Sequence, residues 1–301
     1  MRPLLSIFAL AFPFFVFGCA DSEPAPTKQI AITIDDGPVA RWWSEPSPAH
    51  RTRIVDSLIT ALDRWDAPAT LFVIGRNAES PEAQALLARW KEAGVDLENH
   101  TYNHPNFAQI SLDSIYQEIE RTNDVLAAAG ADDVDYLRVP FLIEGDLERK
   151  QALHDWLARN GMRNAYVTVN NQDWRYNADY AALEDSSKAG GEQVGRDYVQ
   201  HMLESVAYWE NVANELEGRP VNQVLLLHAN RVNRDYLSVL LDSLDARGYG
   251  FITLDEAYED PIYAEPDVYV SEGGESFLEH VRKSRALRGE PVSKSAGADI
   301  E

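Results

Sequence analysis

Two histidines lie four residues apart in the segment from Glu98 to Pro105, and this spacing is the strongest chemical signal in the chain. His100 and His104 follow a short apolar stretch, and the 301 residues contain only seven histidines. Residues four apart on a helical turn face the same way, so we expect both imidazoles to point into one site. Two neutral imidazoles and one carboxylate can bind a catalytic Zn²⁺ and leave a fourth position for water. Taken alone, the pair is equally consistent with surface or core histidines.

Adjacent carboxylates offer the missing ligand. Asp35 and Asp36 end the apolar run 30–34 and precede Gly37 and Pro38, which predicts a strand that ends in a turn. Neighbouring carboxylates repel each other, and a bound cation is the simplest way to keep both ionised. In isolation, a solvated Asp-Asp-Gly turn is the commoner explanation of this pattern.

Three further polar residues stand at or after the ends of predicted strands, where a parallel barrel places its catalytic groups. Arg138 either pairs with a carboxylate and orients it or lies at the surface. Asp173, beside Trp174, either acts in the site or belongs to a loop that covers the barrel. His228 ends a fully apolar strand, where a lone histidine is usually a hydrogen-bonded core residue.

Apolar runs alternate with amphipathic segments, which predicts parallel strands joined by helices. About seven such units fit a distorted (β/α)7-type barrel better than an open sheet, which stays the alternative. Ser80 and Pro81 are typical of the start of a helix. The predicted strands cover 30–34, 69–75, 95–98, 136–140, 165–169, 223–227 and 250–253, and the predicted helices cover 51–65, 81–93, 111–129, 148–160 and 234–247.

We expect a single α/β domain over residues 28–258. A long inserted crossover occupies about 175–220, with a helix over 197–216 after a break at the glycine pair 190–191. Residues 259–301 form a C-terminal extension, of which we predict only the end, 293–301, to be disordered.

Composition excludes some classes of protein. The chain carries 27 Lys and Arg against 49 Asp and Glu, a formal net charge of −22. Such a chain repels nucleic acids and anionic membranes, so we expect neither as a partner. The 45% apolar content is typical of a folded globular protein.

The first residues predict export. Residues 1–18 combine Arg2 with an apolar run that is too short to span a bilayer, as in a cleaved signal peptide. Cys19, the only cysteine, follows this run and resembles the acylated cysteine of a bacterial lipoprotein, with an ordinary cleaved signal as the alternative. Residues 19–27 would be a linker. We therefore expect a periplasmic or cell-envelope protein without internal disulfides or a transmembrane helix.

Five blocks together resemble the NodB-like polysaccharide deacetylases of carbohydrate esterase family four. They occur in the order typical of that family, and the resemblance covers about residues 28–258. The blocks are Thr33 to Pro38, His100 to Pro105, Arg138 to Phe141, Asp173-Trp174 and Leu226 to His228.

The resemblance implies a role for each of these residues. Asp36, His100 and His104 would bind a divalent metal, most simply Zn²⁺, although Co²⁺ and Ni²⁺ suit similar ligands. Asp35 would be the general base, held by Arg138, and His228 the general acid, oriented by Asp173. Trp174 and Leu226 would line a pocket for the acetyl methyl group, and the backbone N–H of Phe141 would stabilise the oxyanion.

The chain also departs from the family pattern. Leu142 stands where a glycine is common, Phe141 where tyrosine is frequent, and Asn170 where an additional aspartate is frequent. These departures affect the shape of the substrate groove rather than the metal and the base. We therefore predict a hydrolase of non-peptide carbon–nitrogen bonds that removes acetyl groups from a peptidoglycan- or chitin-like polysaccharide. The alternatives are an O-acetyl esterase of xylan-like polymers, an amidase of small molecules, and an exported glycan-binding barrel without turnover.

Overall fold

The computed structural model describes residues 28–41, 46–131, 133–184 and 188–293. The predictions for the signal 1–18, for Cys19 and its linker, and for nearly all of the last stretch lie outside these residues. Within them, no helix has the length and apolarity needed to cross a membrane.

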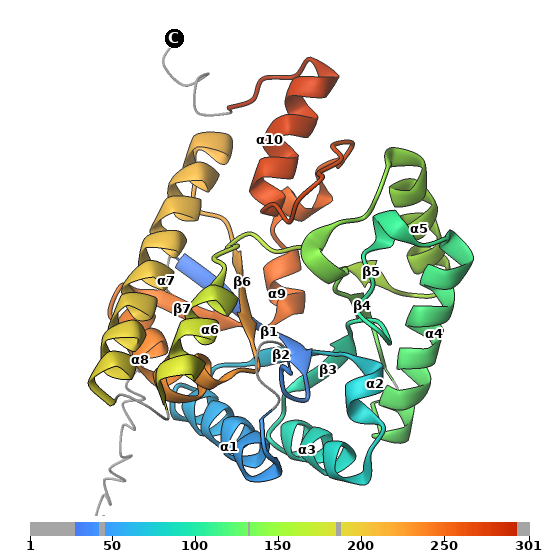
Figure 1. Ribbon diagram of the computed structural model, residues 1–301. Helices are drawn as coiled ribbons and strands as arrows, with labels where there is room; N and C mark the ends of the chain where they lie inside the picture. Colours follow the sequence, from blue (N-terminus) through green and yellow to red (C-terminus); the bar gives the residue numbers. More distant parts are fainter. Residues whose placement is uncertain (1–27, 42–45, 132, 185–187, 294–301) are drawn as a thin grey trace, which may run out of the picture.

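A curled sheet of parallel strands forms the centre of the molecule (Figure 1). Its order is β5-β4-β3-β2-β1-β6, and β7 pairs with the beginning of β1. A bridge between Val169 and Leu225 joins the chain after β5 to β6, at the other end of the sheet. The sheet therefore curls into the predicted distorted (β/α)7-type barrel of a single domain. The strands are β1 (Lys28–Gly37), β2 (Ala69–Val73), β3 (Asp96–Asn99), β4 (Tyr136–Leu137), β5 (Arg163–Asn164), β6 (Gln223–His228) and β7 (Tyr249–Ile252).

Helices flank this sheet, and most of them bury an apolar side in the core around it. Ser80 caps α3 by accepting a hydrogen bond from the backbone N–H of Ala83, as its position before Pro81 predicts. The helices are α1 (Pro48–Arg64), α2 (Gly75–Ala78), α3 (Pro81–Glu92), α4 (Leu112–Ala128), α5 (Leu147–Arg159), α6 (Asp173–Glu184), α7 (Lys188–Glu217), α8 (Arg231–Asp245), α9 (Leu254–Tyr258) and α10 (Phe277–Arg288), with 3-10 turns η1 (Phe107–Gln109), η2 (Pro140–Leu142) and η3 (Pro261–Ala264).

The predicted strand over 165–169 is wrong except at its ends. The backbone N–H of Ala165 donates to Leu137 O in β4, and Val169 bridges to β6. Between them, Val167 O accepts a hydrogen bond from the backbone N–H of Phe277, 2.7 Å away. The C-terminal extension thus satisfies a backbone group that a longer strand would have paired.

The predicted helix break at residues 190–191 is also wrong, because α7 runs through both glycines. A Cβ at Gly195, one turn further on, would collide with the ring of Tyr236 in α8, and a Cβ at Gly191 would lie 3.6 Å from the Tyr180 ring in α6. Gly195 therefore allows the inserted helix to pack closely against α8, whereas a Cβ at Gly191 would make an ordinary van der Waals contact.

The described part of the C-terminal extension, residues 259–293, is folded and packs against the rest of the domain. Its helix α10 stands beside the upper part of α7 (Figure 1). Phe277, Leu278 and Val281 are buried in one cluster with Val212 and Leu216 of α7. The extension is therefore packed against the inserted crossover.

Candidate active site and metal centre

An irregularity in β1 sets the directions of the two aspartate side chains. The strand continues through Asp35 and Asp36 to Gly37, but its pairing with β2 shifts register between Ile34 and Gly37. Asp36 has a positive φ of 67° at this irregularity. An irregularity of this kind redirects a side chain out of the regular alternation of a strand. Asp35 keeps its register with His228 in β6, so the two lie side by side at the same edge of the sheet.

The two histidines converge, but not on a helical turn as predicted. Residues 100–106 form no helix, and Thr101 and His104 both adopt positive φ angles, of 63° and 58°. The side chain of Asn99 holds this loop by accepting the backbone N–H of Thr101 at 2.7 Å, and Thr101 Oγ1 accepts the backbone N–H of His104 at 3.1 Å. Several side-chain hydrogen bonds thus enforce a local conformation that ordinary residues rarely adopt.

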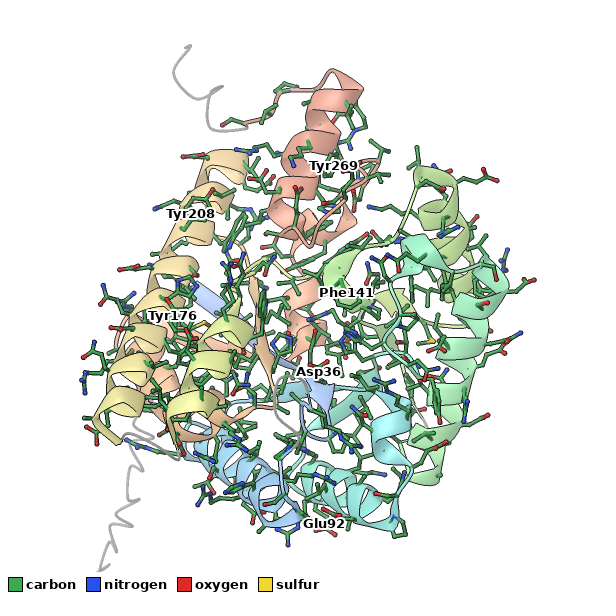
Figure 2. The ribbon with its side chains drawn as sticks, viewed as in Figure 1. Asp36, Glu92, Phe141, Tyr176, Tyr208 and Tyr269 are labelled. Atoms are coloured by element: carbon green, nitrogen blue, oxygen red, sulfur yellow. The ribbon has the colours of Figure 1, made fainter. Side chains whose placement is uncertain are left out.

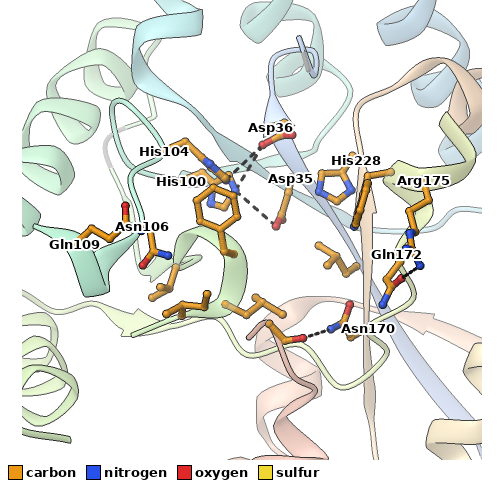
Figure 3. Close-up of a pocket in the computed structure, with 17 residues that line it drawn as sticks. Asp35, Asp36, His100, His104, Asn106, Gln109, Asn170, Gln172, Arg175 and His228 are labelled. Atoms are coloured by element: carbon orange, nitrogen blue, oxygen red, sulfur yellow. Dashed lines mark hydrogen bonds and ion pairs between the residues drawn. The ribbon is translucent and has the colours of Figure 1, made fainter. Parts of the chain in front are cut away.

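Asp36, His100 and His104 form a compact triad. One ligand atom from each lies within 4.8 Å of the others. Asp36 Oδ1 lies 3.7 Å from His100 Nε2 and 3.8 Å from His104 Nε2 (Figure 3). His100 Nδ1 lies 2.8 Å from Arg138 O, and because a carbonyl only accepts, Nδ1 carries the proton and Nε2 presents its lone pair to the triad.

Burial keeps both imidazoles neutral, as metal ligands must be. It lowers the pKa of His100 to about 3, and burial together with the neighbouring His100 lowers the pKa of His104 to about 2. Neutral nitrogen donors and one carboxylate are a donor set that suits Zn²⁺ and related divalent ions. The three residues therefore fit a catalytic metal.

Asp35 is held by a buried arginine. Arg138 Nη1 lies 3.0 and 3.3 Å from the two oxygens of Asp35, and Arg138 Nε donates to Ala165 O at 2.7 Å. Arg138 is fully buried, so its guanidinium has one defined orientation. Burial raises the pKa of Asp35, and the Arg138 charge opposes this shift without cancelling it. A carboxylate with a raised pKa is a better proton acceptor than an ordinary one.

His228 forms a dyad with Asp173. Nδ1 of His228 lies 2.6 Å from Asp173 Oδ1, and its backbone N–H donates to Asp173 Oδ2 at 3.1 Å. Burial alone would lower the pKa of His228, but the Asp173 carboxylate outweighs it and the pKa rises to about 10. The imidazole is therefore charged at neutral pH and able to donate a proton.

The structure brings most of the predicted residues to one pocket of about 930 Å³, which we call the reaction pocket (Figure 3). Its lining includes Asp35, Asp36, His100, His104, Phe141, Trp174, Leu226 and His228, whereas Arg138 and Asp173 lie behind it. Asn106 and Gln109 lie on one side of the acidic and histidine cluster, and Gln172 and Arg175 lie on the other (Figure 3). The pocket therefore extends to both sides of this cluster.

Two of the departures from the family pattern have a visible structural setting. Leu142 has a φ of 57°, a left-handed conformation that a glycine would adopt without strain. Phe141, labelled in Figure 2, is 52% exposed, and its ring packs edge-on against His104 with the ring centres 4.6 Å apart. The η2 turn therefore covers the metal triad with an apolar surface.

Sequence analysis missed Gly274, which reaches the reaction pocket from the C-terminal extension. It also missed Asn233, which donates to Asp173 Oδ2 at 2.8 Å and to His228 O at 2.9 Å. Neither belongs to a motif. Asn233 lies five residues after His228, but only the turn from β6 into α8 shows that it contacts the dyad.

The curled (β/α) barrel thus brings a His–His–Asp triad that could hold a metal ion, and two acid–base candidates, to the ends of its strands. The family described as "Polysaccharide deacetylase" matches residues 22–165. A peptidoglycan-N-acetylglucosamine deacetylase of Bacillus cereus is 24% identical over 53% of this chain. The chain spans 51% of that relative, and 75% and 31% of two other curated relatives.

Solved structures show the same fold. A structure titled "T48 deacetylase with substrate" aligns with a TM-score of 0.55 and 21% identity, and covers 77% of this chain and 92% of its own. A pseudoenzyme of the CE4 family from Bacillus anthracis aligns equally well, with a TM-score of 0.55 and 19% identity over 77% of this chain and 66% of its own. The fold is therefore shared by a deacetylase and a pseudoenzyme.

The matching family model, the relatives named as deacetylases and the shared fold confirm the predicted resemblance to the NodB-like polysaccharide deacetylases of carbohydrate esterase family four. A deacetylase of an N-acetylated polysaccharide hydrolyses an amide bond, which agrees with the predicted class of enzyme.

Proposed function

We propose that this protein is a metal-dependent N-deacetylase of a peptidoglycan- or chitin-like polysaccharide. The observation that carries the proposal is the convergence of a neutral His–His–Asp triad, a base with a raised pKa and a charged histidine on one pocket. A pseudoenzyme shares the fold, so the fold alone does not imply turnover, whereas all the groups required for amide hydrolysis are present here.

Asp36, His100 and His104 would hold the divalent ion. When bound, the ion would make water more acidic and stabilise negative charge on the acetyl carbonyl oxygen. Asp35, oriented by Arg138, would remove a proton from the attacking water. The backbone N–H of Phe141 would donate to the carbonyl oxygen as negative charge develops there.

The leaving group determines the role of the dyad. An amide nitrogen leaves poorly as an anion, so His228 would protonate it from Nε2 while Asp173 stabilises the imidazolium through Nδ1. Trp174 and Leu226 would contact the acetyl methyl group. The products would be acetate and a free amino sugar.

A release assay tests this proposal against its alternatives. Purified protein is loaded with Zn²⁺, Co²⁺ or Ni²⁺, its metal content is measured, and acetate release is compared on N-acetylated oligosaccharides, O-acetylated xylan oligomers and small amides. Preferential release from the N-acetylated sugars supports the proposal, and preference for O-acetyl groups would indicate an esterase instead. A protein that binds glycans, retains no stoichiometric metal and releases no acetate would be a binding barrel.

We also propose that the protein is exported to the periplasm or cell envelope, cleaved after residue 18 and anchored through acylated Cys19. The support is the sequence of residues 1–27 and the relatives named as peptidoglycan deacetylases. Cell fractionation of the full chain and of a Cys19→Ser variant tests the anchor. Release of the variant into the soluble fraction is the expected result, and an unchanged distribution would contradict acylation.

A further inference from the structure

A second cavity opens beside the reaction pocket, and we call it the side chamber. It has a volume of about 290 Å³ and shares Asn170, Gln172 and Gly274 with the reaction pocket, so the two are contiguous. Its remaining lining comes from the inserted helix α7 and from the C-terminal extension, namely Trp209, Glu275, Ser276, Glu279, Arg282 and Lys283. None of these residues belongs to the five blocks that define the catalytic groups.

The wall between the two cavities is fixed by the barrel itself. Asn170 Nδ2 donates to Gly274 O at 2.9 Å (Figure 3). Ser276 Oγ donates to Thr168 O at 2.6 Å. A Cβ on Gly274 would lie 2.6 Å from Phe141 O, so the extension rests directly on the η2 turn that covers the metal triad. This wall therefore has a defined position relative to the site of reaction.

A buried ion network fastens the extension to the barrel. Lys150 of α5 contributes an ammonium that lies 3.0 Å from Glu144 Oε2 and 3.1 Å from Tyr269 O and donates to Asp267. His280 of α10 lies 3.0 Å from the same Asp267 carboxylate. Lysine thus supplies the cation of a cluster whose carboxylates and imidazole have the spacing of a metal site. The part of the extension from Asp267 to His280 is consequently a structural part of the domain.

The chemistry of the side chamber suits an uncharged sugar. Trp209 is half-buried, and its indole N–H donates to Asn170 O at 2.9 Å, which fixes a flat apolar ring in the lining. Arg282 pairs with Glu279 and Lys283 pairs with Glu275, so two cations and two anions balance. Pyranose rings present C–H faces to aromatic rings and hydroxyl groups to such donor–acceptor arrays. A carboxylate-bearing ligand would gain no net attraction here.

We propose that the side chamber binds an uncharged sugar unit adjacent to the one whose acetyl group occupies the reaction pocket, so that the C-terminal extension selects for polymeric substrate. This inference rests on the proposed function. It assigns Trp209, Arg282 and Lys283 as specificity-determining residues.

Chain-length dependence tests the side chamber. The metal-loaded full chain is assayed on the N-acetylglucosamine dimer and pentamer, and we expect kcat/KM to be about tenfold higher on the pentamer, mainly through KM, as about 1.4 kcal/mol of additional binding requires. Trp209→Leu removes the flat ring, so the pentamer-to-dimer ratio of kcat/KM should fall to near one. Trp209→Phe keeps an aromatic ring and should retain most of the tenfold preference for the pentamer. A ratio near one in the unmodified protein, or a ratio that a folded Trp209→Leu variant preserves, would overturn the proposal.

A second set of variants avoids the packed tryptophan. Arg282→Ala with Lys283→Ala changes the exposed rim of the side chamber and should also reduce the pentamer-to-dimer ratio. The matched control, Arg89→Ala with Lys91→Ala, removes two exposed basic residues from α3 and should leave both rates unchanged. Gly274→Ala should displace the wall and lower the ratio, while Gly273→Ala, whose Cβ would meet no atom within 4 Å, should not. If all four variants had the same pentamer-to-dimer ratio of kcat/KM, the assignment of the side-chamber residues as specificity-determining would be contradicted.

A binding measurement separates failure of this inference from failure of the proposed function. Calorimetric titration of the Asp35→Asn protein with both oligomers does not depend on turnover. Tighter binding of the pentamer, lost on adding Trp209→Leu, supports the side chamber even if no acetate is released and the proposed function fails. Equal affinity for both oligomers would overturn the side chamber even if the protein is an active deacetylase.

Discussion

Asp173 accepts two hydrogen bonds from the same residue, one from Nδ1 of His228 at 2.6 Å and one from its backbone N–H at 3.1 Å. Both residues are thereby fixed relative to each other, and the His228 ring cannot rotate without losing a charge-assisted bond. Because Asp173 begins α6, just before the inserted segment, and His228 ends β6, this contact links the start of the insertion to the barrel at the reaction pocket.

The dyad predicts the alkaline side of the pH profile. A general acid must be protonated, so kcat/KM should fall as pH rises through the pKa of His228, which is about 10 without a metal and which a bound dication would lower. Asp173→Asn removes the anion that stabilises the imidazolium, so the alkaline limb should move to lower pH. The measurement is kcat/KM as a function of pH for both proteins. If kcat/KM falls at the same alkaline pH in both, a group other than His228 is the general acid.

The metal ligands and the base should be separable by mutation. His104→Ala removes one of three ligands, so we expect loss of stoichiometric metal and of activity. Asp35→Asn retains all three ligands, so metal content should stay stoichiometric while acetate release is lost. Metal analysis and acetate assay of the same samples test this division, which equal metal loss in the two variants would contradict.

Asn233 is a positioning residue for the dyad. Its side chain is fully buried, donates to Asp173 Oδ2 and to His228 O, and accepts a hydrogen bond from Tyr198 OH of α7. Asn233→Ala should lower kcat/KM by about 10- to 100-fold at unchanged metal content, the effect typical of groups that orient a catalytic residue. Its alkaline limb should also move to lower pH, because a displaced Asp173 stabilises the imidazolium less.

The control for this variant is Asn160→Ala, which removes an exposed asparagine at the end of α5. Tyr198→Phe should show a smaller loss of activity in the same direction. If Asn233→Ala lowers only the melting temperature and leaves the pH profile in place, the residue is merely structural.

The buried ion network should dominate the stability of the extension. Lys150 is 2% exposed, and Lys150→Met leaves the carboxylates of Glu144 and Asp267 without their cation. We expect a loss of about 3–5 kcal/mol in the free energy of unfolding, measured by denaturant titration. Lys91→Met, at an exposed position, should change it by less than about 0.5 kcal/mol.

The pH dependence of this stability has a definite sign. Burial would raise the pKa of Asp267, but His280 and Lys150 outweigh it and lower the pKa to about 2. A carboxyl with a lowered pKa stabilises the fold above its unfolded pKa of about 3.9 and loses this contribution as the pH falls towards 2. The difference between the unmodified protein and Lys150→Met should therefore shrink over that interval. A constant difference would place the effect in packing rather than charge.

The sequence by itself indicated the class of fold and the candidate catalytic groups. Apolar runs alternating with amphipathic segments predict parallel strands joined by helices, and an open sheet stayed the alternative to a barrel until the structure showed the curled sheet. The candidate site residues belong to short blocks in which neighbours along the chain are also neighbours in space, as in Asp35 with Asp36 and Asp173 with Trp174. These patterns are local, and local patterns can be recognised without coordinates.

Tertiary structure alone decided how those groups converge and what surrounds them. The histidines meet through left-handed residues at 101 and 104, which Asn99 and Thr101 stabilise, and not through a helical turn. Gly274 lies 133 residues from Phe141 along the chain, yet the two touch, because the extension docks through hydrogen bonds and a buried ion network whose partners are far apart in sequence. Contacts of that kind depend on the closure of the whole domain, so no spacing along the chain reveals them.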